Sequence, residues 1–153
     1  MARLIGKALT PDLTRYLRAR NEGRFTDVIL VTTTDEANAP HVAMLSHWEV
    51  FAADASNIML ATYADSRTTR NLMRRQVVML VVVNRRMSYY VRGVAKLLKK
   101  RMEEDPYNSM FAIRVKAVYK DTLPGTKILS GITFAKSPGA EPHGPLHAEL
   151  VRG

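Results

Sequence analysis

The chain of 153 residues suits one domain, and its 46% hydrophobic and 24% charged residues are typical of a globular protein in solution. It contains no cysteine, which excludes disulfides, thiolate metal sites and a cysteine nucleophile and fits a reducing cytoplasm. The net charge is +9, and its whole positive excess lies in residues 66–101, which hold eleven Lys and Arg and no acid. Residues 1–65 sum to −2 and residues 102–153 to zero. The basic segment at 66–101 predicts either an anionic partner or a solvated basic face.

The first half of the chain predicts one helix followed by strands. Thr10 is a good N-cap and Pro11 suits the first helical position, so we expect a helix from there to a stop near Gly23. Strands are expected at 28–34, at 41–52 as one long run, and at 58–63, because β-branched and aromatic residues recur there between turn residues.

The second half predicts a basic helix at 66–75 and further strands at 76–84, 88–98 and 110–120. A short helix is expected within 99–108 and a last strand at 127–134. The longest aliphatic run, at 77–83, is far shorter than the ~20 residues that span a bilayer, so no membrane span is expected. Together the elements predict a mainly β, mostly antiparallel barrel over 1–136, followed by a Pro/Gly-rich tail over 137–153 that is mobile or draped over a neighbour.

The junction between the strand at 58–63 and the helix at 66–75 carries the clearest local chemistry. The first backbone N–H groups of this helix are free, and hydroxyls are added there by Ser66, Thr68 and Thr69. Forked cations are added by Arg67 and Arg70. This pattern indicates a phosphate-binding pocket, and it is equally typical of a capped basic surface helix.

Four stretches in this order resemble the pyridoxamine 5'-phosphate oxidase-like FMN-binding split-barrel family: 40–46 (PHVAMLS), 58–72 (IMLATYADSRTTRNL), 77–83 (VVMLVVV) and 89–97 (YYVRGVAKL). The resemblance covers roughly residues 10–120. It implies a six- to seven-stranded antiparallel split β-barrel and a homodimer that holds FMN at its interface. It further implies a cytoplasmic flavoprotein oxidoreductase of unknown substrate, in which the flavin carries the redox chemistry.

The resemblance also places cofactor-binding residues. In the family, the strand that matches His41, Val42, Ala43 and Met44 runs along the flavin ring and ribityl chain. The remaining positions implied are Ala61 and Thr62 at the ring, Ser66, Arg67 and Thr68 in the phosphate turn with Asn71 after it, and Ser88 as a polar residue near the flavin. No catalytic residue can be named from the sequence.

The sequence departs from the family at several points. Thr68 stands where the oxidases carry a Lys, His41 stands where they often carry Arg, and their C-terminal Trp- and Arg-bearing segment has no counterpart. Oxidation of pyridoxamine phosphate is therefore not expected. A deazaflavin-dependent reductase of the same fold remains an alternative, as does a basic β-barrel that binds nucleic acid through residues 66–101.

No metal site is expected. His143 and His147 have the spacing of two ligands on a helix, but Gly144 and Pro145 lie between them.

Overall fold

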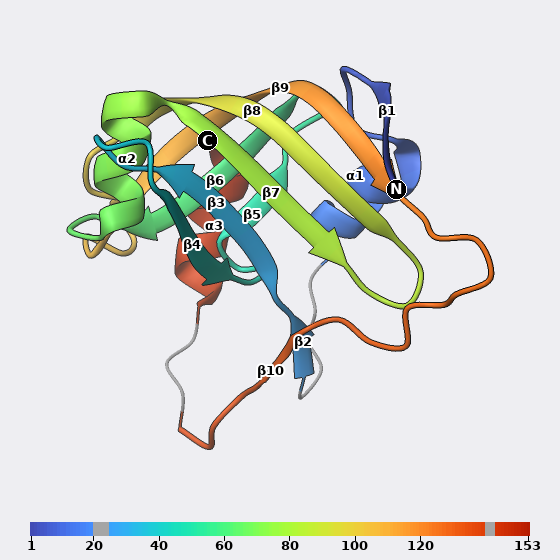
Figure 1. The fold of residues 1–153 in the computed structure, drawn as a ribbon. Coiled ribbons are helices and arrows are strands. Elements are labelled where there is room, and N and C mark those ends of the chain that lie inside the picture. The colour runs from blue at the N-terminus through green and yellow to red at the C-terminus, as the bar shows by residue number, and fades with distance from the viewer. Residues whose placement is uncertain (20–24, 140–142) are drawn as a thin grey trace.

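The computed structural model describes residues 1–19, 25–139 and 143–153, and its centre is a curled antiparallel sheet (Figure 1). The eight strands of this sheet are β1 (Ala2–Gly6), β3 (Ile29–Thr34), β4 (Pro40–Leu45), β5 (Val50–Ala52), β6 (Asn57–Tyr63), β7 (Val77–Val83), β8 (Ser88–Lys99) and β9 (Asn108–Asp121). They follow the order β4-β3-β7-β8-β9-β6-β5, with β1 paired to β9. The predicted mainly β, antiparallel split barrel is confirmed.

A separate two-stranded ribbon and three helices complete the fold. The ribbon pairs β2 (Phe25–Asp27) with β10 (Thr133–Ala135). The helices are α1 (Pro11–Arg18), α2 (Arg67–Arg75) and α3 (Gly144–Arg152). None of these described helices has the length and apolar composition needed to cross a membrane.

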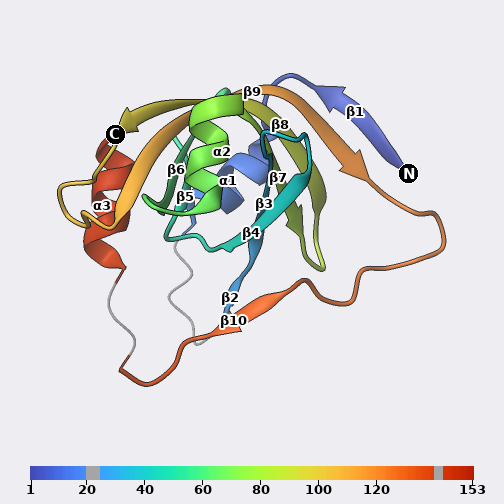
Figure 2. The ribbon, with the colours of Figure 1, turned by 60° about the vertical axis from the view of Figure 1, so that its left-hand side comes forward.

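The main core lies on the concave side of the curled sheet, where α1 is packed (Figure 2). Thr10 caps α1, and Leu13 and Leu17, one turn apart, are fully buried among strand residues such as Leu60 and Phe111. The predicted helix start is therefore confirmed. The helix ends at Arg18, before the expected stop, and Gly23 lies outside the described residues.

The predicted strand at 41–52 is wrong as one run, because it is two strands separated by a turn. The Glu49 carboxylate accepts hydrogen bonds from the backbone N–H of Ser46, at 2.8 Å, and from the Ser46 hydroxyl. These contacts close a turn between β4 and β5, which lie at opposite ends of the strand order, so the alternating residues belong to two separate edge strands.

The expected helix within 99–108 and the expected strand at 127–134 are also wrong. In the first, β8 and β9 are joined by turns, with the N–H of Met102 bonded to the carbonyl of Asn108 at 2.8 Å. In the second, only β10 is strand, and its partner β2 was not predicted. Gly131 passes so close to the Val83 carbonyl that a Cβ would sit 2.1 Å from its oxygen, so this segment crosses the end of β7.

The segment predicted as a tail contains α3, which packs on the protein's own sheet. Leu146 and Leu150 are buried against Met59 and Met110 in a second apolar cluster. Pro145 lies in the first turn of α3, where its missing N–H costs no helical hydrogen bond. A helix can therefore begin in this Pro/Gly-rich segment and pack against the sheet.

Candidate functional site

The junction between β6 and α2 is held together by hydroxyl groups. Ser66 is the N-cap of α2, and its Oγ accepts a hydrogen bond from the N–H of Thr69 at 3.1 Å. The Thr69 hydroxyl lies 2.6 Å from the Thr62 hydroxyl and donates to the Tyr63 carbonyl at 2.7 Å. The capped-helix interpretation is thus correct in its geometry, and Thr69 serves the junction and not a ligand.

A cavity of about 420 Å³ opens beside this junction. One wall consists of the second half of β4, the following turn, the end of β6 and the start of α2. The opposite wall consists of β2, β10 and the chain just after β10. The lining residues are Thr26, Ala43, Met44, Leu45, Ser46, Trp48, Glu49, Thr62, Tyr63, Ser66, Thr68, Phe134, Ala135, Lys136, Ser137 and His143.

Five residues predicted from the family resemblance meet in this cavity, although they come from three separate elements. Ala43 and Met44 are on β4, Thr62 is on β6, and Ser66 and Thr68 begin α2. Thr68, which stands where the family's oxidases carry a Lys, is only 3% exposed and still lines the cavity. The volume lies within the range of small-molecule and cofactor sites.

The other predicted residues lie outside the lining of this cavity. His41 and Val42 precede the lining part of β4, and Arg67 is exposed on the first turn of α2. Ala61 is fully buried and lines a neighbouring space of about 50 Å³. For these four residues, cofactor contact stays a prediction.

Two further predicted residues, Asn71 and Ser88, also lie outside the lining of this cavity. The Asn71 amide donates a hydrogen bond to the Thr33 hydroxyl at 3.0 Å, which ties α2 to β3. Ser88 begins β8 and lines a different cavity of about 650 Å³, together with Tyr90 and Lys120. Within one chain, the structure therefore does not bring Ser88 to the residues of α2.

The positive charges of residues 66–101 are less unbalanced than the sequence indicates. Arg74 pairs with Glu36, Lys99 with Glu149 at 2.8 Å, and Arg101 with Asp65 at 3.2 Å. Beside the cavity, Arg70 donates to the backbone carbonyl of Asp65 at 2.8 Å. Arg67 has no ion pair or hydrogen bond to any described residue, so its guanidinium is available to an anion at the helix start.

The structure adds a residue that sequence reasoning missed. Thr26 on β2 is 4% exposed, lines the cavity, and its hydroxyl has no hydrogen-bond partner among the described residues. A buried hydroxyl left unpaired costs about 1–3 kcal/mol, so a ligand or water that bonds to it is favoured. No local signal identifies Thr26, because β2 pairs with β10, more than a hundred residues later.

The donor set fits a molecule with an apolar ring and an anionic end. Met44, Leu45 and Phe134 offer apolar walls, while Thr68 and the free N–H groups of α2 offer donors. Among the described residues, no group of three or more His, Asp or Glu side chains is placed to hold a metal ion.

Comparison with known proteins identifies the family and the fold. Residues 25–134 match the model of a family described as pyridoxamine 5'-phosphate oxidase. The fold resembles a candidate pyridoxamine 5'-phosphate oxidase from Lactobacillus delbrueckii, with a TM-score of 0.62 at 15% identity, covering 77% of this chain and 98% of that one. It also resembles HupZ of Group A Streptococcus, with a TM-score of 0.57 at 14% identity over 72% and 97% of the two chains.

A third structure of similar fold is an F420 reductase, with a TM-score of 0.51 at 12% identity, covering 61% of this chain and 89% of that one. No curated protein matches the chain in sequence.

Proposed function

The chain belongs to the pyridoxamine 5'-phosphate oxidase family, and we propose that it binds FMN in the cavity beside α2 and acts as an FMN-dependent oxidoreductase. The observation that carries the proposal is the convergence of Ala43, Met44, Thr62, Ser66 and Thr68 on that one cavity. Bound FMN supplies hydride and electron transfer, and the protein supplies position, charge and exclusion of water.

Each part of the cavity has a role in this proposal. The start of α2 holds the phosphate through its free N–H groups, the Thr68 hydroxyl and the Arg67 guanidinium. Met44 and Leu45 pack against the apolar ring, and Thr26 offers its unpaired hydroxyl to a polar atom of the ligand. No side chain is required to carry a proton for hydride transfer, which agrees with the absence of an assigned catalytic residue.

We further propose that the protein is a homodimer that covers this cavity. Val42 and Met44 lie on the same face of the edge strand β4 and are 55% and 57% exposed. Tyr63, which lines the cavity, is 70% exposed. An apolar rim beside a cofactor cavity is the kind of surface that a second subunit buries.

Pyridoxamine phosphate is not proposed as the substrate. The family's oxidases complete their substrate site with a C-terminal Trp- and Arg-bearing segment, whereas the C-terminal segment here forms α3, which is docked on β6. A deazaflavin coenzyme is the second candidate, favoured by the fold of the F420 reductase and by the absence of a Lys at Thr68.

The decisive experiment is a fluorescence titration of the protein with FMN and, separately, with a deazaflavin coenzyme. Replacing Arg67 with Ala is expected to weaken FMN binding about ten- to a hundredfold, the scale of a lost charged hydrogen bond. Arg114→Ala is the matched control, because Arg114 is also exposed but lies on β9, opposite Asn57 at the far end of β6 from the start of α2.

The outcomes separate the claims. Equal FMN affinity in the Arg67 and Arg114 variants would refute the phosphate role of α2. Absence of FMN binding to the unaltered protein would overturn the FMN assignment, and binding of the deazaflavin alone would favour the second candidate.

A further inference from the structure

A second and larger cavity lies on the opposite face of the β2–β10 ribbon from the proposed cofactor site. It has a volume of about 700 Å³ and lies between α1, the turn that joins β7 to β8, and the segment before β10. The β2–β10 ribbon separates the two spaces, since Thr26 and Phe134 line the first cavity and Asp27 and Thr133 line the second. Neither the family resemblance nor the proposed function uses this second space.

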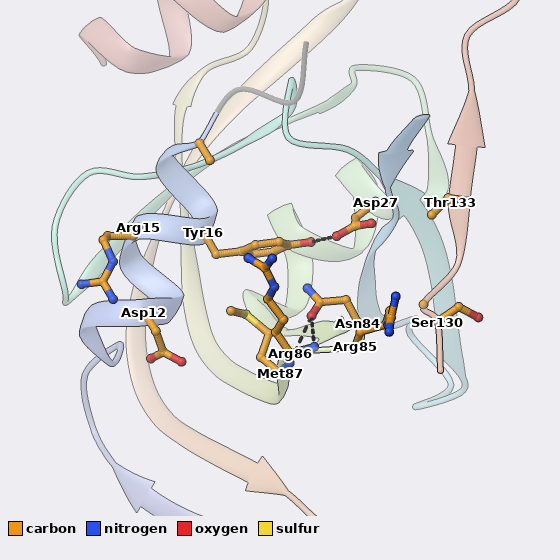
Figure 3. A pocket seen from close by; sticks show the side chains of 12 residues that line it. Asp12, Arg15, Tyr16, Asp27, Asn84, Arg85, Arg86, Met87, Ser130 and Thr133 are labelled. Atoms are coloured by element: carbon orange, nitrogen blue, oxygen red, sulfur yellow. Dashed lines mark hydrogen bonds between the residues drawn. The ribbon is translucent and has the colours of Figure 1, made fainter. Parts of the chain in front are cut away.

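Arginine side chains without partners gather at this cavity. Among the described residues, six arginine side chains make no hydrogen bond, ion pair or ring contact: Arg3, Arg15, Arg67, Arg85, Arg86 and Arg114. Three of these six, Arg15, Arg85 and Arg86, line the second cavity, which we call the arginine cavity. Figure 3 shows Arg86 rising from the turn beneath Tyr16 and Arg85 on the side of Ser130.

The two acidic residues that line the arginine cavity, Asp12 and Asp27, form no ion pair with its three arginines, and two carboxylates leave an excess of positive charge over them. Asp27 accepts a hydrogen bond from the Tyr16 hydroxyl at 2.7 Å (Figure 3). Asp12 accepts from the Tyr89 hydroxyl at 2.9 Å and from the Thr10 hydroxyl. Burial, followed by the bond to Asp27, raises the pKa of Tyr16, so its phenol keeps its proton and continues to donate to Asp27.

The turn that carries Arg85 and Arg86 has a fixed shape. The Asn84 side-chain oxygen accepts from the N–H of Arg86 at 2.8 Å and from the N–H of Met87 at 3.1 Å. On its other side, Gly131 lies against the carbonyl of Val83, which holds the crossing segment on the end of β7. The two guanidinium groups therefore extend from a defined backbone, which reduces the ordering cost of binding.

We propose that the arginine cavity is a ligand site for an organic anion, a molecule with an apolar body and a carboxylate or phosphate group. The guanidinium groups of Arg85 and Arg86 match the oxygens of either anion, and Arg15 adds a third positive charge from α1. The Tyr16 ring, Ala19 and the Met87 side chain provide apolar surface for the body of the ligand. The volume admits a molecule of several rings or a mononucleotide-sized compound.

The test uses three probes of similar size: phenyl phosphate, benzoate and uncharged benzamide. Each is titrated into the full chain while amide signals are followed by NMR. Saturable shifts are expected around 84–87 and Tyr16 with phenyl phosphate or benzoate and not with benzamide. The anion that binds more tightly identifies the group for which the site is built.

The affinity of variants for the anion shows whether it binds in the arginine cavity, in the cofactor cavity, or non-specifically to a basic protein. The double variant Arg85→Gln/Arg86→Gln is expected to weaken binding of the tighter anion at least tenfold. Arg67→Gln and Arg114→Gln remove charge elsewhere and are expected to change it less than twofold. Equal weakening in all variants, shifts centred on 66–68, or equal binding of benzamide would overturn the proposal, and none of these results depends on flavin binding.

Discussion

Glu149 offers a direct test of how the C-terminal helix is attached. Its side chain is 1% exposed, and its carboxylate accepts three hydrogen bonds: from Lys99 Nζ at 2.8 Å, from the N–H of Glu103 at 2.9 Å and from the N–H of Glu104 at 2.7 Å. Because one oxygen faces the Glu104 N–H and the other serves Lys99 and Glu103, both oxygens must be acceptors. A single substitution that turns one of them into a donor should therefore loosen α3.

Glu149→Gln makes this change with almost no change of shape. One side of the amide still accepts, while the other now opposes an N–H group or leaves it unpaired. An unpaired buried amide costs about 1–3 kcal/mol, and the loss of a charged acceptor adds to it, so we expect the free energy of unfolding to fall by about 2–4 kcal/mol. Glu103→Gln is the control, because its carboxylate is exposed and its contact with Lys99 is 3.3 Å long, so its expected effect is below about 0.5 kcal/mol.

Urea unfolding at two pH values measures both the cost and its origin. Burial alone raises the pKa of Glu149, but the bond from Lys99 and those from the two N–H groups outweigh it, so the folded-state pKa lies below the ordinary value of 4.5. The carboxylate therefore stabilises the fold fully above pH 4.5 and less as the pH falls through the folded-state value. The gap between the original protein and Glu149→Gln should be wide at pH 7 and narrow in acid. A gap no larger than that of the Glu103 control, or one that does not depend on pH, would refute this account of α3.

Two further predictions concern the sheet and the dimer. At Gly93, a Cβ would lie 2.7 Å from the backbone oxygen of Arg114, so Gly93→Ala is expected to lower the free energy of unfolding by about 1–3 kcal/mol, whereas Gly6→Ala, with nothing within 4 Å, should leave thermal unfolding nearly unchanged. Met44→Glu places a charge on the proposed subunit contact and should yield a monomer with weakened FMN binding in light-scattering and titration experiments. Leu4→Glu, at the same 57% exposure on β1, should leave the dimer and the FMN affinity unchanged. Identical behaviour of the two variants would show that β4 is not part of the subunit contact.

The elements predicted correctly from the sequence are those whose signals are local. Thr10 and Ser66 each cap a helix in the structure as their positions predict. The strand at 58–63 and the aliphatic strand at 77–83 are also found, because each is predicted by an uninterrupted run of mostly apolar residues.

The missed elements depend on partners far away in the chain. β1 is held by β9, with Ala2 opposite Asp121, and nothing near Ala2 indicates that pairing. In the same way α3 depends on Glu149 reaching the chain at 103–104, and the turn at Ser46 depends on Glu49. These are tertiary contacts that override a weak local pattern.

The candidate site was predicted only in part for the same reason. The family motif located Ser66 and Thr68, which are close in sequence to the strand they follow. The opposite wall, with Thr26 and Phe134, comes from the β2–β10 ribbon, and the sequence contains no signal for that pairing. The arginine cavity was missed because Arg15 and Arg85 are brought together only by the fold.

We propose that bound FMN has its phosphate at the start of α2, and a crystal structure of the protein grown with FMN would show where the flavin lies. Flavin density is expected between β4 and the β2–β10 ribbon, with phosphate oxygens about 2.7–3.2 Å from donors of Ser66, Arg67 or Thr68. Flavin density elsewhere on the protein, or a cavity beside α2 that stays filled by the protein's own side chains at saturating FMN, would contradict it.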